Sequence, residues 1–207
     1  MKLKKKYKIL IGIILFVLIA VLILLVYNNF FKQDGAKETK VIASIKDYGY
    51  ELKDNKNTTY KNMFNELKTI LETEKVDYES YASKISELFI YDFYSLNDKA
   101  AKNDIGGVDF VHPEAINNFL ENAESTYYKY VESNIYGNRK QVLPMVDTVT
   151  ISQVEPTNYM IGDVPVEEAY KTTATWTYTD EQFSDYQNSA SIILVRDKNK
   201  LLIVELN

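Results

Sequence analysis

The pattern of hydrophobic and polar positions divides the chain into a short apolar segment and a longer body. Residues 9–27 read ILIGIILFVLIAVLILLVY and contain no charged side chain. A helix of this length rises about 28 Å, close to the ~30 Å hydrocarbon core of a bilayer. The pattern predicts a transmembrane helix with its interface residues over 9–31, and the anchor residues include Ile9, Leu15, Leu18, Leu22, Leu25 and Tyr27.

Charge on either side of this segment predicts its orientation. Residues 1–8 form a basic segment without acidic residues, and its lysines are Lys2, Lys4, Lys5, Lys6 and Lys8. By the positive-inside rule this segment is cytoplasmic and the C-terminal domain is extracytoplasmic. A cleaved signal peptide has a shorter apolar stretch and small residues at its cleavage site, and neither feature is present here. We therefore predict an uncleaved, single-pass anchor in the cell membrane.

Three amphipathic helices are predicted in the body of the chain. Residues 32–56 are mixed and polar, which is typical of a linker. Apolar residues then recur three and four apart over residues 59–74 and 77–97, and again from Pro113 to about Val131. Asp77 is a good N-cap, and proline suits a first helical turn. Between the second and third helices, a Gly106-Gly107 turn and a short extended piece are expected.

After residue 144 the apolar period changes from that of a helix to that of a strand. Val149 and Ile151 alternate with polar residues, and a longer alternation runs over residues 170–178 with threonine on its second face. Two further apolar runs flank a turn at residues 197–200, which indicates a hairpin. Helices followed by strands joined through short connections predict an α+β domain over residues 57–207, with three helices and an antiparallel sheet.

This order of elements resembles the NTF2-like family, whose domains are cone-shaped α+β structures. The resemblance covers residues 57–207 and rests on the three helices, the short extended piece before the last of them and the strands that follow. It implies that the three helices are packed on a curved antiparallel sheet, which wraps them and leaves a pocket at its wide end. NTF2-like domains behind one membrane helix are similar to parts of bacterial secretion and conjugation machinery and to other membrane proteins of Gram-positive bacteria.

Composition narrows the chemistry that the chain offers. There is no cysteine, which excludes disulfides, thiolate metal sites and cysteine nucleophiles. Residues 32–207 carry ten more acidic than basic side chains, which argues against nucleic acid as a partner. The NTF2-like pocket would be lined by Asp109, His112, Trp176 and Tyr178, and an acid–base pair of Asp109 and His112 is one alternative. The other is that His112, the one histidine, caps the helix that starts at Pro113.

These observations favour a function without catalysis, metal or cofactor. We expect a membrane-anchored interaction or assembly domain of a bacterial envelope complex, with the lipid bilayer and envelope proteins as its partners. The first alternative is a binding module that holds a small ligand or a peptide in the pocket. The second is an enzyme that uses Asp109 and His112.

Overall fold

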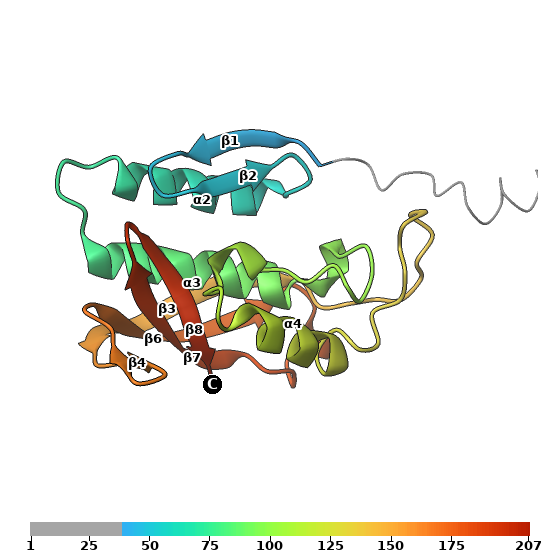
Figure 1. Cartoon of the computed structure of the whole chain (residues 1–207). Coiled ribbons are helices and arrows are strands. Elements are labelled where there is room, and N and C mark those ends of the chain that lie inside the picture. Colours follow the sequence, from blue (N-terminus) through green and yellow to red (C-terminus); the bar gives the residue numbers. More distant parts are fainter. Residues whose placement is uncertain (1–38) are drawn as a thin grey trace, which may run out of the picture. The chain divides into compact units, whose positions relative to one another are not determined.

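Helices cover one face of a four-stranded antiparallel sheet in the computed structural model, which describes residues 39–207 (Figure 1). The predicted basic segment, the transmembrane helix and the first part of the linker lie in residues 1–38, outside the described residues. Residues Thr39–Asn207 form one compact unit. Within that unit no helix is both long enough and apolar enough to cross a membrane. The predicted α+β class, with three helices and an antiparallel sheet, is confirmed.

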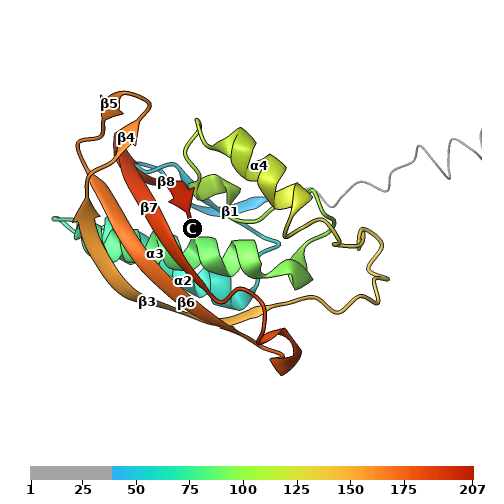
Figure 2. The same ribbon diagram turned by 90° about the horizontal axis from the view of Figure 1, so that it is seen from below.

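The two longer helices begin where their capping residues predict. α2 spans Thr58–Leu71, and the side chain of Asn57 accepts a hydrogen bond from the Tyr60 amide. α3 spans Tyr78–Tyr94, and the predicted N-cap Asp77 accepts from the Glu79 amide. α3 lies between α2 and the sheet and is buried along most of its length, so it forms the centre of the core (Figure 2).

The sheet has the order β3-β6-β7-β8. These strands span Val146–Thr157, Ala169–Tyr178, Ser189–Asp197 and Lys200–Leu206. The predicted alternation in β6 is confirmed, because Thr172, Ala174 and Trp176 are buried while Lys171 and Thr175 are exposed. A two-residue turn joins β7 to β8, as expected. A small hairpin of β4 (Met160–Ile161) and β5 (Val164–Pro165) interrupts the path from β3 to β6.

The prediction that residues 32–56 form a linker is wrong for residues 41–53, which are folded. β1 (Val41–Ile45) and β2 (Tyr50–Lys53) form an antiparallel hairpin that belongs to the folded unit. The hairpin is held by Tyr50, which is 1% exposed and whose hydroxyl bonds to the Leu201 carbonyl at 2.9 Å. The predicted boundary at residue 57 therefore moves to about residue 39.

The third helix is shorter than predicted. α4 spans Ile116–Ser125, and Pro113 lies in the turn before it. Thr126, with φ −117° and ψ −92°, ends the helix. The following residues continue as turns, so Tyr128 is buried whereas Tyr130, which the predicted helix would include, is 75% exposed.

The Gly106-Gly107 turn brings the segment before α4 against α3. Gly107 has φ +75°, and an added Cβ would lie 2.6 Å from the Phe89 ring. Short 3-10 turns at Leu96–Asp98 (η1) and Val108–Phe110 (η2) flank this segment. The expected extended piece is reduced to one parallel bridge between Val111 and Ile203 of β8. This bridge places the start of α4 beside the last strand.

Candidate functional site

A cavity of about 440 Å³ lies between α4, the C-terminal part of α3 and β8. Its buried lining is apolar and comes mainly from α3, α4 and β8: Phe89, Phe93, Tyr94, Val111, Ala123 and Ile203. The exposed residues of its lining are polar: Asn118, Asn122, Thr126, Gln187 and Asn207. Glu205 also lines it and is half-buried, as are Phe119, Val204 and Leu206. No lysine, arginine or histidine of the described residues lines it, so Glu205 is its one charged side chain there.

Aromatic rings form the inner wall of the cavity. The Phe93 ring centroid lies 5.2 Å from that of Phe119 and 5.9 Å from that of Tyr127. Phe89 stacks on Phe93 at 5.5 Å. These separations are typical of favourable aromatic pairs. The wall is therefore a packed surface that two helices and the turn after α4 build together.

A chain of hydrogen bonds fixes the ring of Tyr127 at one side of the cavity. The Trp176 indole N–H donates to the Tyr178 hydroxyl at 2.9 Å, and that hydroxyl donates to the Gln187 carbonyl at 2.6 Å. The hydroxyl groups of Tyr127 and Tyr178 lie 3.1 Å apart. Since the Tyr178 oxygen already donates its proton to Gln187, Tyr127 is the donor in this pair. Burial, and then the bond to Tyr178, raises the pKa of Tyr127.

The hydroxyl of Tyr94 differs from those of its neighbours. Tyr94 lines the cavity and is 1% exposed, and within residues 39–207 no hydrogen bond reaches its oxygen. Every fully buried polar side-chain atom in this part of the chain has a partner, so the Tyr94 oxygen must touch accessible space. Burial raises the pKa of Tyr94, which keeps it a neutral hydroxyl that can donate and accept.

A second cavity of about 440 Å³ adjoins the first. Both are lined by Thr126, Tyr127 and Gln187, so the ring of Tyr127 lies in their shared wall. The second cavity lies between the loop that follows α4 and the 3-10 turn Glu181–Phe183 (η3), and most of its lining is apolar.

None of the four residues expected to line the pocket lines this cavity. Trp176 and Tyr178 contact each other and support Tyr127 from β6, but neither lines the cavity. Asp109 is exposed, with its carboxylate 3.9 Å from the Lys53 ammonium. His112 Nδ1 accepts a hydrogen bond from the Glu114 amide at 3.3 Å in the turn before α4, whereas the N-cap of α4 is Ala115 and has no side-chain cap. Among the described residues, no hydrogen bond or ion pair joins Asp109 to His112.

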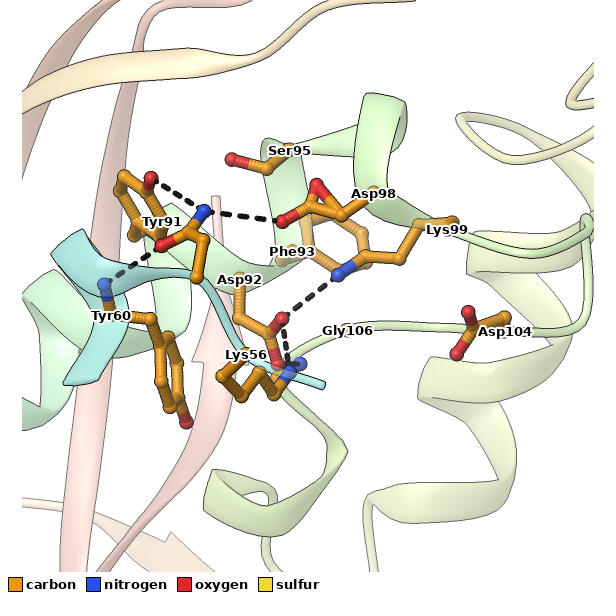
Figure 3. A network of polar contacts seen from close by, with 12 residues as sticks. Lys56, Tyr60, Tyr91, Asp92, Phe93, Ser95, Asp98, Lys99, Asp104 and Gly106 are labelled. Atoms are coloured by element: carbon orange, nitrogen blue, oxygen red, sulfur yellow. Dashed lines mark hydrogen bonds and ion pairs between the residues drawn. The ribbon is translucent and has the colours of Figure 1, made fainter. Parts of the chain in front are cut away.

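A buried ionic network supports α3 behind the cavity, and the sequence analysis missed it (Figure 3). The Asp92 carboxylate bonds to the ammonium groups of Lys56 at 2.6 Å and Lys99 at 2.8 Å, and to the Gly107 amide at 2.9 Å. Burial alone would raise the pKa of Asp92, but the two ammonium groups outweigh it and hold the pKa far below the usual value. The spacing of these residues gives no signal, because they converge only in the fold.

Neither a metal-binding cluster in the described residues nor a known relative assigns a function to the cavity. Within residues 39–207 no group of three or more histidine, aspartate and glutamate side chains is placed to hold a metal ion. Comparison with models of protein families, with curated proteins and with solved structures finds no match to this chain.

Proposed function

We propose that this chain is a membrane-anchored, extracytoplasmic binding domain without catalytic activity. In this proposal the cavity beside α4 holds a small ligand or a side chain of a peptide. The observation that carries the proposal is a cavity of about 440 Å³ with an aromatic inner wall, an accessible polar margin and Tyr94 in its lining, whose hydroxyl has no hydrogen-bond partner within residues 39–207. Ligand pockets commonly combine an apolar lining with a few polar groups that fix orientation.

The finer fold assignment is also a proposal. An NTF2-like arrangement is supported by the order of three helices and then four antiparallel strands, and by a cavity between the last helix and the sheet. That is where the pocket of such a domain is expected. The identification rests on element order and shape, because no family model matches.

The lining indicates which ligands the cavity favours. Rings of Phe93, Phe119 and Tyr127 offer dispersion contacts to an apolar or ring-shaped group. Side-chain amides at the margin offer both donors and acceptors. Because Glu205 is the one charged lining residue within residues 39–207 and no cation there balances a ligand anion, an anionic group would be buried without a partner. We therefore propose an uncharged or cationic, partly apolar ligand.

Two neighbouring asparagines provide a matched test of the cavity. Asn118 lines it, whereas Asn117 is exposed on the same helix and does not. Residues 39–207 contain the whole described core, so they are suited to thermal unfolding with a library of uncharged and cationic compounds. A bound compound raises the midpoint by mass action. Asn118→Trp should abolish that rise and Asn117→Trp should keep it. Equal rises in both variants, or no rise with any compound, would contradict the proposal.

The anchor and its orientation need a separate test in cells. The chain has no cysteine, so one can be introduced as a unique label. An impermeant thiol reagent should label Asp163→Cys, which lies in an exposed turn, and should not label Lys4→Cys until the cells are opened. Labelling of the Lys4→Cys variant in intact cells would overturn the proposed topology.

A second candidate function, an assembly subunit of an envelope complex, is favoured by the outer edge of β3. This strand spans twelve residues and within residues 39–207 it pairs with β6 alone. A free strand edge can pair with an extended segment of another chain. Cross-linking in intact cells through Thr150→Cys, compared with Thr175→Cys in the interior strand β6, should capture one defined protein at the edge site only. The same random neighbours at both sites would remove this candidate.

A further inference from the structure

Large apolar side chains are exposed mainly at one end of the domain. The loop between α4 and β3 projects at the end where β1 begins, and the β4–β5 hairpin lies at the opposite end in both views (Figures 1 and 2). Two of these side chains come from the start of β1 and four come from the loop: Val41, Ile42, Tyr130, Ile135, Tyr136 and Val142. Tyr136 is 72% exposed. We call residues 129–142 the tyrosine loop.

The charge of the tyrosine loop is opposite to that of the domain. The described residues hold 17 lysines and arginines against 27 aspartates and glutamates. The loop itself holds Lys129, Arg139 and Lys140 against Glu132 alone. Both lysines are exposed, and the Lys129 ammonium lies over the Tyr130 ring at 5.2 Å. Exposed aromatic side chains beside basic side chains are typical of surfaces that contact anionic lipid.

The base of the loop is fixed to the domain. The guanidinium of Arg139 donates to the carbonyl of Lys99 at 2.8 Å and to that of Asn97 at 2.7 Å. The amide of Asn134 donates to the Ala100 carbonyl at 2.6 Å. These bonds hold the loop against the segment after α3. Because the base of the loop is already ordered, little conformational entropy is lost when its exposed apolar side chains bind a surface.

Chain length places a limit on the distance between this end of the domain and the membrane. The predicted interface ends at Phe31, and the described part begins at Thr39. The seven residues between them span at most about 25 Å when fully extended. This step rests on the proposed anchor. It means that the end of the domain carrying the exposed apolar residues is the end tethered near the bilayer.

We propose that the tyrosine loop is a second membrane contact, which docks the domain on anionic lipid of the outer leaflet. Ile135 and Tyr136 enter the interfacial region, where tyrosine is favoured, and Lys129 and Lys140 face the headgroups. The acidic remainder of the domain is repelled by the same surface, which orients the domain with this end toward the lipid. Docking of this kind sets how the cavity is presented to its ligand.

The test uses the full chain in vesicles of phosphatidylcholine with or without phosphatidylglycerol. An environment-sensitive fluorophore is attached to Asn138→Cys in the loop or to Asp163→Cys in the β4–β5 turn at the opposite end. With phosphatidylglycerol, the first probe should shift to the blue and be quenched by lipid-borne quenchers, and the second should remain in water. Lys129→Gln with Lys140→Gln should lower the ratio of docked to undocked domain about 25-fold, or about fivefold per lysine.

Matched apolar variants separate docking from damage to the fold. Ile135→Ser with Tyr136→Ser should abolish the shift, whereas Met160→Ser with Val164→Ser, equally exposed at the other end, should leave it unchanged. The proposal is overturned if the fluorophore at position 138 stays in water with phosphatidylglycerol present. It is also overturned if that fluorophore enters vesicles of phosphatidylcholine alone to the same extent. The proposed anchor is judged separately, because a chain that fails to float with the vesicles after an alkaline wash contradicts the anchor itself.

Discussion

Replacing Asp92 by asparagine removes one negative charge from a site that also holds two ammonium groups. Lys99 is 5% exposed and its ammonium is 2.8 Å from the carboxylate, so it cannot turn to water. The side chain of Lys56 is 21% exposed and can reach solvent when the carboxylate is lost. Removing one partner of a buried ion pair costs about 3–5 kcal/mol. Because one lysine can relax, we expect a loss of about 3 kcal/mol from the free energy of unfolding.

Urea unfolding of residues 39–207 measures this loss. Asp109→Asn is the matched control, since that carboxylate is exposed and 3.9 Å from Lys53, and its effect should stay within about 0.5 kcal/mol. An Asp92→Asn variant that loses less than about 1 kcal/mol would refute the reasoning, because Lys99 would then not need its partner.

The same network predicts how stability depends on pH. In the unfolded chain the pKa of Asp92 is about 3.9, and in the folded chain Lys99 and Lys56 hold it far lower. The stabilisation is therefore fully present above the unfolded value and is lost as the pH falls toward the folded value. The difference in unfolding free energy between the parent chain and Asp92→Asn should narrow below about pH 4. A constant difference from pH 7 to pH 3 would contradict the assignment.

Three further substitutions test the surroundings of the cavity by the same unfolding assay. Tyr128→Phe should cost about 1–3 kcal/mol, because the buried hydroxyl donates to the Phe93 carbonyl and accepts from the Gly106 amide. Tyr94→Phe should change stability by less than about 0.5 kcal/mol, yet weaken any ligand bound there about threefold to tenfold. Gly107→Ala should cost at least about 1 kcal/mol, since φ is +75° and the new methyl group meets the Phe89 ring.

Elements with a strong local pattern were predictable from the sequence. α3 follows from the N-cap Asp77 and from apolar residues that recur at helical spacing, and the structure ends it at Tyr94. β6 follows from the alternation over residues 170–178. In both elements the residues that set the pattern are close together in sequence, and burial on one face is sufficient to specify the element.

Features that depend on distant residues were not predictable. The β1–β2 hairpin is stabilised by Tyr50, whose hydroxyl reaches Leu201, 151 positions away. The end of α4 at Thr126 places Tyr128 beneath Gly106, a contact that no helical period encodes. The candidate site shows the same limit, since Trp176 was expected to line a pocket and instead supports Tyr127 from behind the wall. The order of elements in the sequence was enough to suggest a pocket, but the residues that line it come together only in the fold.

The central claim is that the anchored domain holds a ligand in the cavity beside α4. The most direct measurement places a photo-reactive side chain at position 118 or 117 of the full chain and irradiates intact cells. We predict an adduct of one defined mass at position 118, which lines the cavity, and none at its neighbour 117. The same adducts at both positions, or no adduct at either, would contradict the claim.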